Sequence, residues 1–202
     1  MADRVTAKSS DTKFTPHPEG QFVALCVDVI DLGEKVDSGP NFPDKLSPKC
    51  VLVFRTGEKN PDTGEVVDVA QEYTVSMGEK ANLRKALESW RGKAYTQDQA
   101  DEGVPVDKLV GNAALIGVAH KISVAKKRPY AVIQSIVGVP KLMLPAVPLG
   151  TDYKRAEFWA DRKAEYAEAA KKFRAAAGAP PAEAEFEEFP GYQQQDDDDL
   201  PF

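Results

Sequence analysis

Five stretches of this 202-residue chain are rich in Val, Ile and Leu, and turn-forming residues separate them. They cover residues 21–33, 49–56, 66–76, 112–121 and 130–140. Short runs of branched apolar residues bounded by Gly, Pro and Asn are typical of β-strands. The pattern therefore predicts five strands.

The connections between the first three stretches differ in kind. Glu34–Pro48 contains three prolines, which predicts a loop, and this loop carries Phe42. Asn60–Gly64 predicts a tight turn, because Pro61 presets its own φ and Gly64 accepts a positive φ. Two strands around such a turn form an antiparallel hairpin, so we expect the second and third strands to pair.

A helical period replaces the strand pattern between the third and fourth stretches. Leu83, Leu87 and Trp90 are spaced at i, i+4 and i+7, which places them on one face of a helix over residues 78–91. Gly92 follows as a stop signal. Trp90 lies on the apolar face, so we interpret it as a core residue. The basic residues of the polar face are interpreted as solvated: Arg84, Lys85 and Arg91.

A second, alanine-rich helical pattern extends from Thr151 to Ala177. Phe158, Tyr166 and Phe173 fall near one face, with Trp159 beside it. The apolar stripe is narrow, which leaves open whether the helix packs on the rest of the chain. Its Lys and Arg side chains are expected to remain in water.

The order strand, strand, strand, helix, strand, strand is that of an OB-fold, a small Greek-key barrel. We therefore predict a mainly β fold: a five-stranded OB-fold Greek-key barrel with a helix between strands 3 and 4, plus a C-terminal helix and a disordered acidic tail. The expected organisation is a flexible N-terminal arm, the barrel domain, a linker, the helix and the tail. Their boundaries are 1–19, 20–140, 141–150, 151–177 and 178–202.

Charge is divided unevenly along the chain. The net charge is −6, yet residues 178–202 hold four Glu and four Asp and no Lys or Arg. Removing these eight from the 32 acidic residues leaves 24 against 26 basic residues in 1–177, a net of +2. A weakly basic body with an acidic tail is the asymmetry of a nucleic-acid binder that also recruits partners.

Several classes of function have no support in the sequence. Two Cys and two His give no metal-ligand spacing, so neither a metal nor another cofactor is expected. There is no nucleophile motif or phosphate-cradling glycine loop, so we do not expect an enzyme. With no apolar signal sequence or membrane-length run, we expect a cytoplasmic protein. Cys26 and Cys50 are then interpreted as buried thiols.

The tail ends in four consecutive carboxylates and an apolar tip: Asp196, Asp197, Asp198, Asp199, Leu200, Pro201 and Phe202. An apolar tip on an acidic tether suits a pocket on another protein, where the ring fills the pocket and basic residues bind the carboxylates. The alternative is a merely solubilising tail. The tip resembles that of bacterial single-stranded DNA-binding proteins. This resemblance implies that residues 196–202 recruit replication and repair proteins.

The body carries a resemblance of its own. The runs Cys26–Gly33, Tyr73–Ser76, Leu83–Lys85, Leu87–Lys93 and Leu109–Gly111 are similar to a phage family of single-stranded DNA-binding proteins. The similarity spans roughly residues 20–140. It implies that the barrel domain binds single-stranded DNA in phage replication, recombination or repair, in the cytoplasm of a bacterial host.

Binding single strands needs cations for phosphates and aromatic faces for bases. In an OB-fold the site lies on strands 2 and 3 and the flanking loops. On strand 2 we expect Lys49, Val51, Val53 and Arg55 to face outward, away from the core residues Cys50, Leu52 and Phe54. Tyr73 is left open between a stacking ring and a core ring. The predicted DNA contacts are Phe42, Lys49, Arg55, Tyr73, Lys121, Lys126, Lys127, Arg128 and Tyr130.

The sequence thus predicts a protein that binds single-stranded DNA without strong sequence preference and recruits partners through its tail. Two alternatives stay open. One is an OB-fold adaptor that binds only proteins, and the other is a strand-annealing recombination protein. Whether the chain forms a homo-oligomer is not decided by the sequence.

Overall fold

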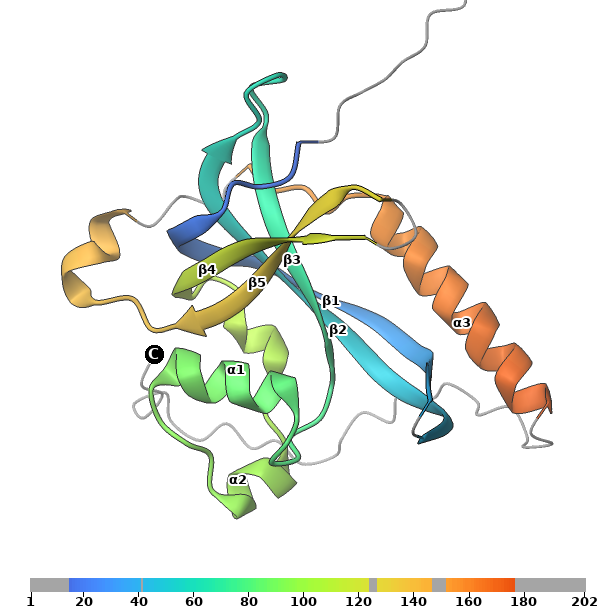
Figure 1. Cartoon of the computed structure of the whole chain (residues 1–202). Coiled ribbons are helices and arrows are strands. Elements are labelled where there is room, and N and C mark those ends of the chain that lie inside the picture. Colours follow the sequence, from blue (N-terminus) through green and yellow to red (C-terminus); the bar gives the residue numbers. More distant parts are fainter. Residues whose placement is uncertain (1–14, 41, 124–126, 147–151, 177–202) are drawn as a thin grey trace, which may run out of the picture.

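The computed structural model describes residues 15–40, 42–123, 127–146 and 152–176. Its centre is one five-stranded antiparallel sheet in the order β3-β2-β1-β4-β5 (Figure 1). The strands are β1 (Gly20–Gly39), β2 (Phe42–Lys59), β3 (Val66–Thr74), β4 (Ala113–Ile122) and β5 (Pro129–Val137). The predicted set of five strands is confirmed, and the sheet is not closed.

Strands β1 and β2 extend much further than predicted. Residues 34–39 and 42–48 continue the pairing as a long arm, in which Val36 lies opposite Leu46 and Gly39 opposite Phe42. The loop prediction for this range was therefore wrong. The sequence carries prolines here, but register shifts at Asp31/Gly33 and Asp37/Gly39 interrupt the regular ladder. Such bulges increase twist and tolerate irregular positions.

The β2–β3 turn agrees with its prediction. The N–H of Gly64 donates to the carbonyl of Asn60 over 2.8 Å, and Gly64 has a φ of 72°. That conformation strains any residue with a Cβ, so glycine suits it. The two strands then pair from Lys49–Thr74 to Arg55–Asp68, followed by a register shift to Lys59–Val66.

One face of the sheet packs on α1 (Asn82–Arg91). Leu83, Leu87 and Trp90 are buried, as predicted, against strand residues that include Cys50, Leu52 and Phe54. The Trp90 indole N–H donates to the carbonyl of Ala113 over 2.8 Å. The helix begins four residues later than expected and ends at Gly92, which has a left-handed conformation.

The opposite face of β1 and β2 packs on α3 (Phe158–Ala176). Trp159 is buried against Ile30, Leu32, Val51 and Val53. The helix therefore docks on the sheet, a point that the sequence left open (Figure 1). Phe158, expected on the packing face, is instead 53% exposed, because Trp159 is the ring that enters the interface.

Shorter elements connect these parts: α2 (Gln97–Glu102), η1 (Val106–Leu109) and η2 (Lys141–Ala146). Thr96 caps α2 with a reciprocal capping box to Gln99. Residues 15–19, predicted to belong to a flexible arm, pack on the sheet: the His17 side chain is 2% exposed and lies edge-on to Phe22. No helix among the described residues is long and apolar enough to cross a membrane.

Candidate nucleic-acid interface

The edge strands β3 and β5 face each other across an open groove, which we call the seam groove. It consists of two hollows of about 1040 and 770 Å³ that share Gln71, Glu72, Ile133 and Gln134. The larger hollow reaches the first turns of α1, and the smaller one reaches the beginning of α3. The groove therefore runs along β5, between the two helices.

A side chain connects the two edge strands where they approach. The N–H of Ile133 on β5 donates to the Gln71 side-chain oxygen on β3 over 3.3 Å. The Gln71 amide nitrogen donates in turn to the carbonyl of Glu72 over 3.2 Å. Gln71 thus bridges a gap that no backbone ladder spans within the described strands. On either side of the bridge the groove is open to solvent.

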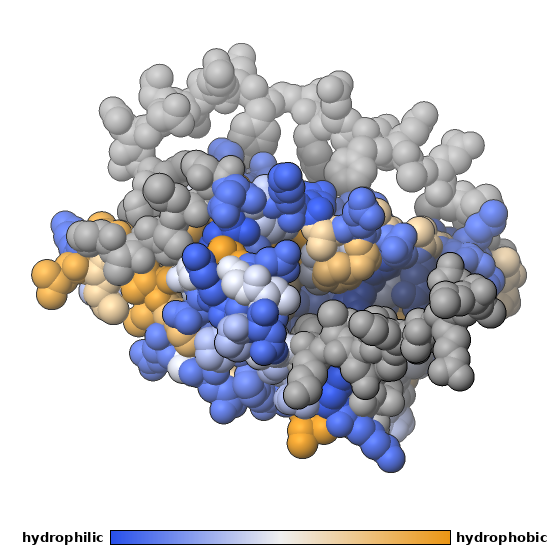
Figure 2. Space-filling model, turned by 90° about the horizontal axis from the view of Figure 1, so that it is seen from above, coloured by the Kyte–Doolittle hydropathy of each residue, from blue (hydrophilic) through white to orange (hydrophobic). Residues whose placement is uncertain are grey.

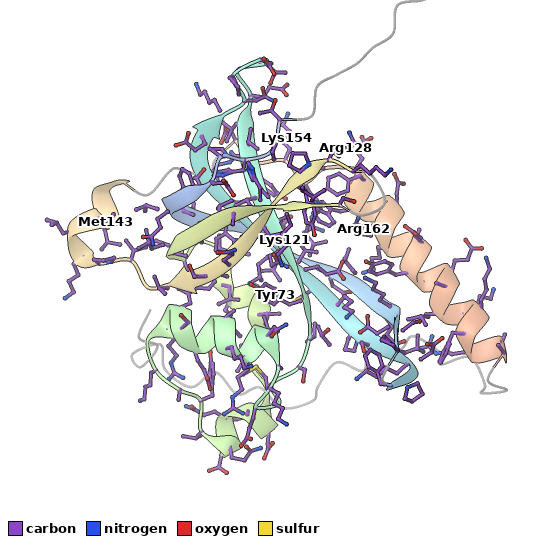
Figure 3. All side chains as sticks on the ribbon, in the orientation of Figure 1. Tyr73, Lys121, Arg128, Met143, Lys154 and Arg162 are labelled. Carbon is purple, nitrogen blue, oxygen red and sulfur yellow. The ribbon has the colours of Figure 1, made fainter. Side chains whose placement is uncertain are left out.

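Cations outnumber carboxylates in the groove, although the whole chain is acidic. Lys80 and Lys85 are exposed at its α1 end, and Lys121 and Arg162 are exposed at its α3 end. Figure 3 shows Tyr73, Lys121 and Arg162 in the central part of the molecule. The charged lining is Lys80, Lys85, Lys121 and Arg162 with Glu72 and Glu79, together with Lys49, which is buried and paired with Asp37. Such a track suits a polyanionic backbone.

Two tyrosine rings line the groove. Tyr130 is 41% exposed in the smaller hollow. Tyr73 lines the larger hollow, is half-buried and packs against the inner core. Burial raises the pKa of Tyr73 to about 12, so its phenol stays neutral at physiological pH. Tyr130 is thus available for stacking, while Tyr73 combines a core contact with a place in the groove.

Lys49 and Arg55 do not lie on an open face. Each is only 6% exposed. Lys49 Nζ donates to Asp37 over 2.6 Å and to the hydroxyl of Thr74 over 2.7 Å. Arg55 forms a two-pronged pair with Asp68, at 2.8 and 2.9 Å, and also contacts Asp152. Their cationic groups therefore neutralise carboxylates of this chain.

The expected open face is occupied because α3 covers it. That face presents carboxylates, which we call the acidic strip: Asp28, Asp31 and Glu34 on β1, and Glu72 on β3. Cations from α3 and the segment before it pair with each of them. The pairs are Arg155–Asp28, Lys163–Asp31, Arg174–Glu34 and Arg162–Glu72. The expectation that these side chains remain in water holds for Arg155 and Lys163, which are 53% and 52% exposed while they form their pairs, but not for Arg174, which is half-buried.

Asp28 accepts three short hydrogen bonds from the segment before α3. Burial opposes its ionisation, but hydrogen bonds from Arg155 and Tyr153 outweigh burial and hold the pKa of Asp28 below its ordinary value. The three oxygen–donor distances are 2.6, 2.7 and 2.9 Å. An uncovered acidic strip would repel phosphate, so the covered face is a poor candidate for binding nucleic acid.

The remaining predicted contacts lie outside the groove lining. Phe42 is 48% exposed at the end of the β1–β2 arm, where Lys45 Nζ lies 5.8 Å from its ring centre. Lys127 and Arg128 are exposed in the β4–β5 turn, beside the α3 end of the groove.

Two of the predicted binding elements fall outside the described residues. One is Lys126, which belongs to the expected phosphate contacts of the β4–β5 turn. The other is the whole C-terminal tip: Asp196, Asp197, Asp198, Asp199, Leu200, Pro201 and Phe202. Their roles in binding DNA and partners therefore stay predictions from the sequence.

Other polar side chains and the two cysteines have structural roles. Arg84 is 9% exposed; it pairs with Glu88 and donates to the carbonyls of Met77 and Tyr95. Its interpretation as solvated was therefore wrong. His120 donates to the carbonyl of His17 over 2.8 Å. The two cysteines are buried free thiols, as predicted.

Sequence reasoning missed several groove residues. Lys80 lies just before α1 and Lys85 lies in its first turn, and Lys85 was interpreted as part of a merely solvated face. Arg162 and Trp159 line the groove only because α3 docks on β1 and β2, which brings its first turn to the smaller hollow. The position of Trp159 three residues before Arg162 was the one local signal, since that spacing puts both on one helix face.

The fold and the groove define an antiparallel β protein with a cationic, ring-lined channel between its edge strands. No protein-family model, no curated protein and no solved structure matches this chain at a significant level. Among the described residues, no cluster of His, Cys, Asp or Glu could hold a metal ion.

Proposed function

We propose that this protein binds single-stranded DNA in the seam groove and recruits other proteins through its C-terminal tip. The observation that carries the proposal is the groove itself: exposed cations stand at both of its ends, and each of its two hollows has a tyrosine in its lining. Binding without sequence preference requires these two elements, a cationic track and stacking surfaces.

The strand order supports the proposal. In our interpretation the sheet is an OB-fold whose barrel is open between β3 and β5, with Gln71 in place of the closing ladder. OB-folds are partly open barrels that use their strand 2–3 region for oligonucleotides. Here α3 covers the outer face of β1 and β2, so we place the nucleic acid in the seam instead.

The tail contributes a second activity in this proposal. Residues 196–202 join four carboxylates to Leu-Pro-Phe, the pattern that resembles the tip of bacterial single-stranded DNA-binding proteins. We propose that this tip binds replication or repair proteins in a bacterial cytoplasm, as part of phage replication or recombination. Nothing in the described groove suggests catalysis, and we propose a binding protein rather than an enzyme.

A charge-matched titration tests the groove. Lys85→Ala/Lys121→Ala removes one exposed cation from each end, and Lys59→Ala/Lys171→Ala removes two exposed cations that do not line the groove. Anisotropy of labelled oligo-dT is measured at several salt concentrations. The groove variant should bind more weakly, and its log–log salt slope should be shallower by about 0.7 per lost contact.

The control variant separates the site from net charge. It carries the same charge change, so equal losses in both variants would contradict the seam groove as the site. If the unaltered protein does not bind oligo-dT at all, the protein-interaction adaptor becomes the better account.

A further inference from the structure

The 3-10 turn η2 presents apolar side chains to water. Leu142 is 93% exposed, Leu144 is 48% exposed and Met143 is 39% exposed. We call these three residues the η2 tip. Figure 2 shows apolar residues projecting at the left edge of the molecule, the side on which Figure 1 places η2. Contiguous exposed apolar residues on a soluble protein mark interaction sites.

A second exposed apolar pair lies at the other end of the β4–β5 hairpin. Ile122, the last residue of β4, is 75% exposed, and Phe158, the first residue of α3, is 53% exposed. Their chain neighbours Lys121 and Trp159 line the same hollow of the seam groove, which places both at this end of the molecule. We call Ile122 and Phe158 the hairpin-end patch.

The two apolar surfaces cannot meet within one molecule. The nine residues of β5 separate them, and an extended strand of that length spans about 30 Å. Figure 3 shows Met143 at one side of the molecule, well away from Lys121 and Arg162. The seam groove follows β5 from Tyr130 to Ile136, so it runs from the hairpin-end patch toward the η2 tip.

A single strand of nucleic acid has a direction, and this constrains how neighbouring molecules meet. Molecules that bind it through the same groove all point the same way along the strand. The leading end of one then faces the trailing end of the next, so contact requires two different surfaces. Such head-to-tail interfaces build open chains rather than closed dimers. The η2 tip and the hairpin-end patch lie at the two ends that would meet.

We propose that the η2 tip of one molecule docks on the hairpin-end patch of the next molecule along the same strand. The partner is a second copy of this chain, and the result is cooperative coating. This inference rests on the proposed function. Five apolar side chains make a small contact, so it should be weak in free solution. Binding to one strand raises the effective concentration of the neighbour, and there the contact becomes significant.

The test compares oligo-dT long enough for one molecule with oligo-dT long enough for two. We expect the second molecule to bind at least tenfold more tightly than the first. Leu142→Ser and Ile122→Ser should each reduce this ratio toward one while affinity for the one-site oligonucleotide is kept. Val110→Ser, at an exposed apolar residue outside both surfaces, is the matched control and should keep the ratio.

Mixing the two variants tests the head-to-tail geometry. The Ile122→Ser copy keeps an intact η2 tip and the Leu142→Ser copy keeps an intact hairpin-end patch, so one order of the pair restores the contact. Partial recovery of the ratio in the mixture is expected. The interface would be overturned if both single variants kept the tenfold ratio of second-molecule to first-molecule affinity. It would also be overturned if mixing the variants did not raise that ratio. If the unaltered protein does not bind the one-site oligonucleotide, the proposed function itself is overturned.

Discussion

Replacing Trp159 with alanine should undock α3 from the sheet. Trp159 is 9% exposed and fills a space between Ile30, Leu32, Val51 and Val53. Truncating a buried Trp typically costs about 3–5 kcal/mol, and we expect the lower end because the ring lies at the margin of the sheet. The nearby Lys163–Asp31 pair has side chains 52% and 61% exposed, so Lys163→Ala should cost below about 1 kcal/mol.

Hydrogen exchange measures this difference locally. A loss of about 3 kcal/mol raises the open fraction of α3 roughly 100-fold, because each 1.4 kcal/mol is a factor of ten. Amides of α3 should therefore exchange much faster in Trp159→Ala, while those of β4 keep their protection. Lys163→Ala should change exchange less than tenfold. A larger effect of Lys163→Ala would refute the conclusion that the apolar contact, rather than the ion pairs, holds the helix.

The same variant shows whether α3 hides a binding surface. Undocking α3 uncovers the acidic strip and withdraws Arg162 from the seam groove, so affinity for oligo-dT should fall. If affinity rose instead, α3 would be covering the true site, and the assignment to the seam groove would be wrong.

Three further outcomes follow from the described contacts and the charge pattern. Tyr130→Ala should weaken oligo-dT binding by about 1–3 kcal/mol and leave the free energy of unfolding unchanged. Tyr73→Ala should weaken binding and also lower the free energy of unfolding, because Tyr73 packs against the inner core. Denaturant titration of the two variants would show this difference. Burial lowers the pKa of His17 below its ordinary 6.5. The contribution of neutral His17 to the free energy of unfolding should therefore be full above pH 6.5 and decline as the pH falls toward the folded-state pKa. His17→Gln should flatten this decline in thermal unfolding measured from pH 7.5 to 5. Deleting residues 178–202 should raise oligo-dT affinity at low salt and raise it less at high salt, because eight carboxylates of the tail compete with phosphate. Removing only Phe202 should leave DNA binding unchanged but abolish the capture of partner proteins. If partners are still captured, the tip is not a docking element.

Local pattern predicted the elements of the inner core well. Alternation along β2 correctly assigned Cys50, Leu52 and Phe54 to one buried face. Helical spacing did the same for Leu83 and Trp90. In both cases the information lies within a few residues, because a strand repeats every two positions and a helix every 3.6.

The binding surface could not be predicted in the same way. Lys49 and Arg55 occupy outward positions on β2, and local pattern cannot reveal that Asp37, Asp68 and Asp152 neutralise them. These partners come from other strands and from the segment before α3. That helix packs on the sheet through Trp159, Tyr166 and a row of ion pairs rather than through a wide apolar stripe, so amphipathicity gave little warning of its docking.

Chemical-shift mapping tests the central claim most directly. The ¹⁵N-labelled protein is titrated with oligo-dT, and backbone amide shifts are followed residue by residue. The seam groove predicts the largest changes at Gln71–Thr74 on β3 and Ile133–Ile136 on β5, with little change in the arm around Phe42. Shifts concentrated on the arm or on the outer surface of α3, with β3 and β5 unaffected, would contradict the account.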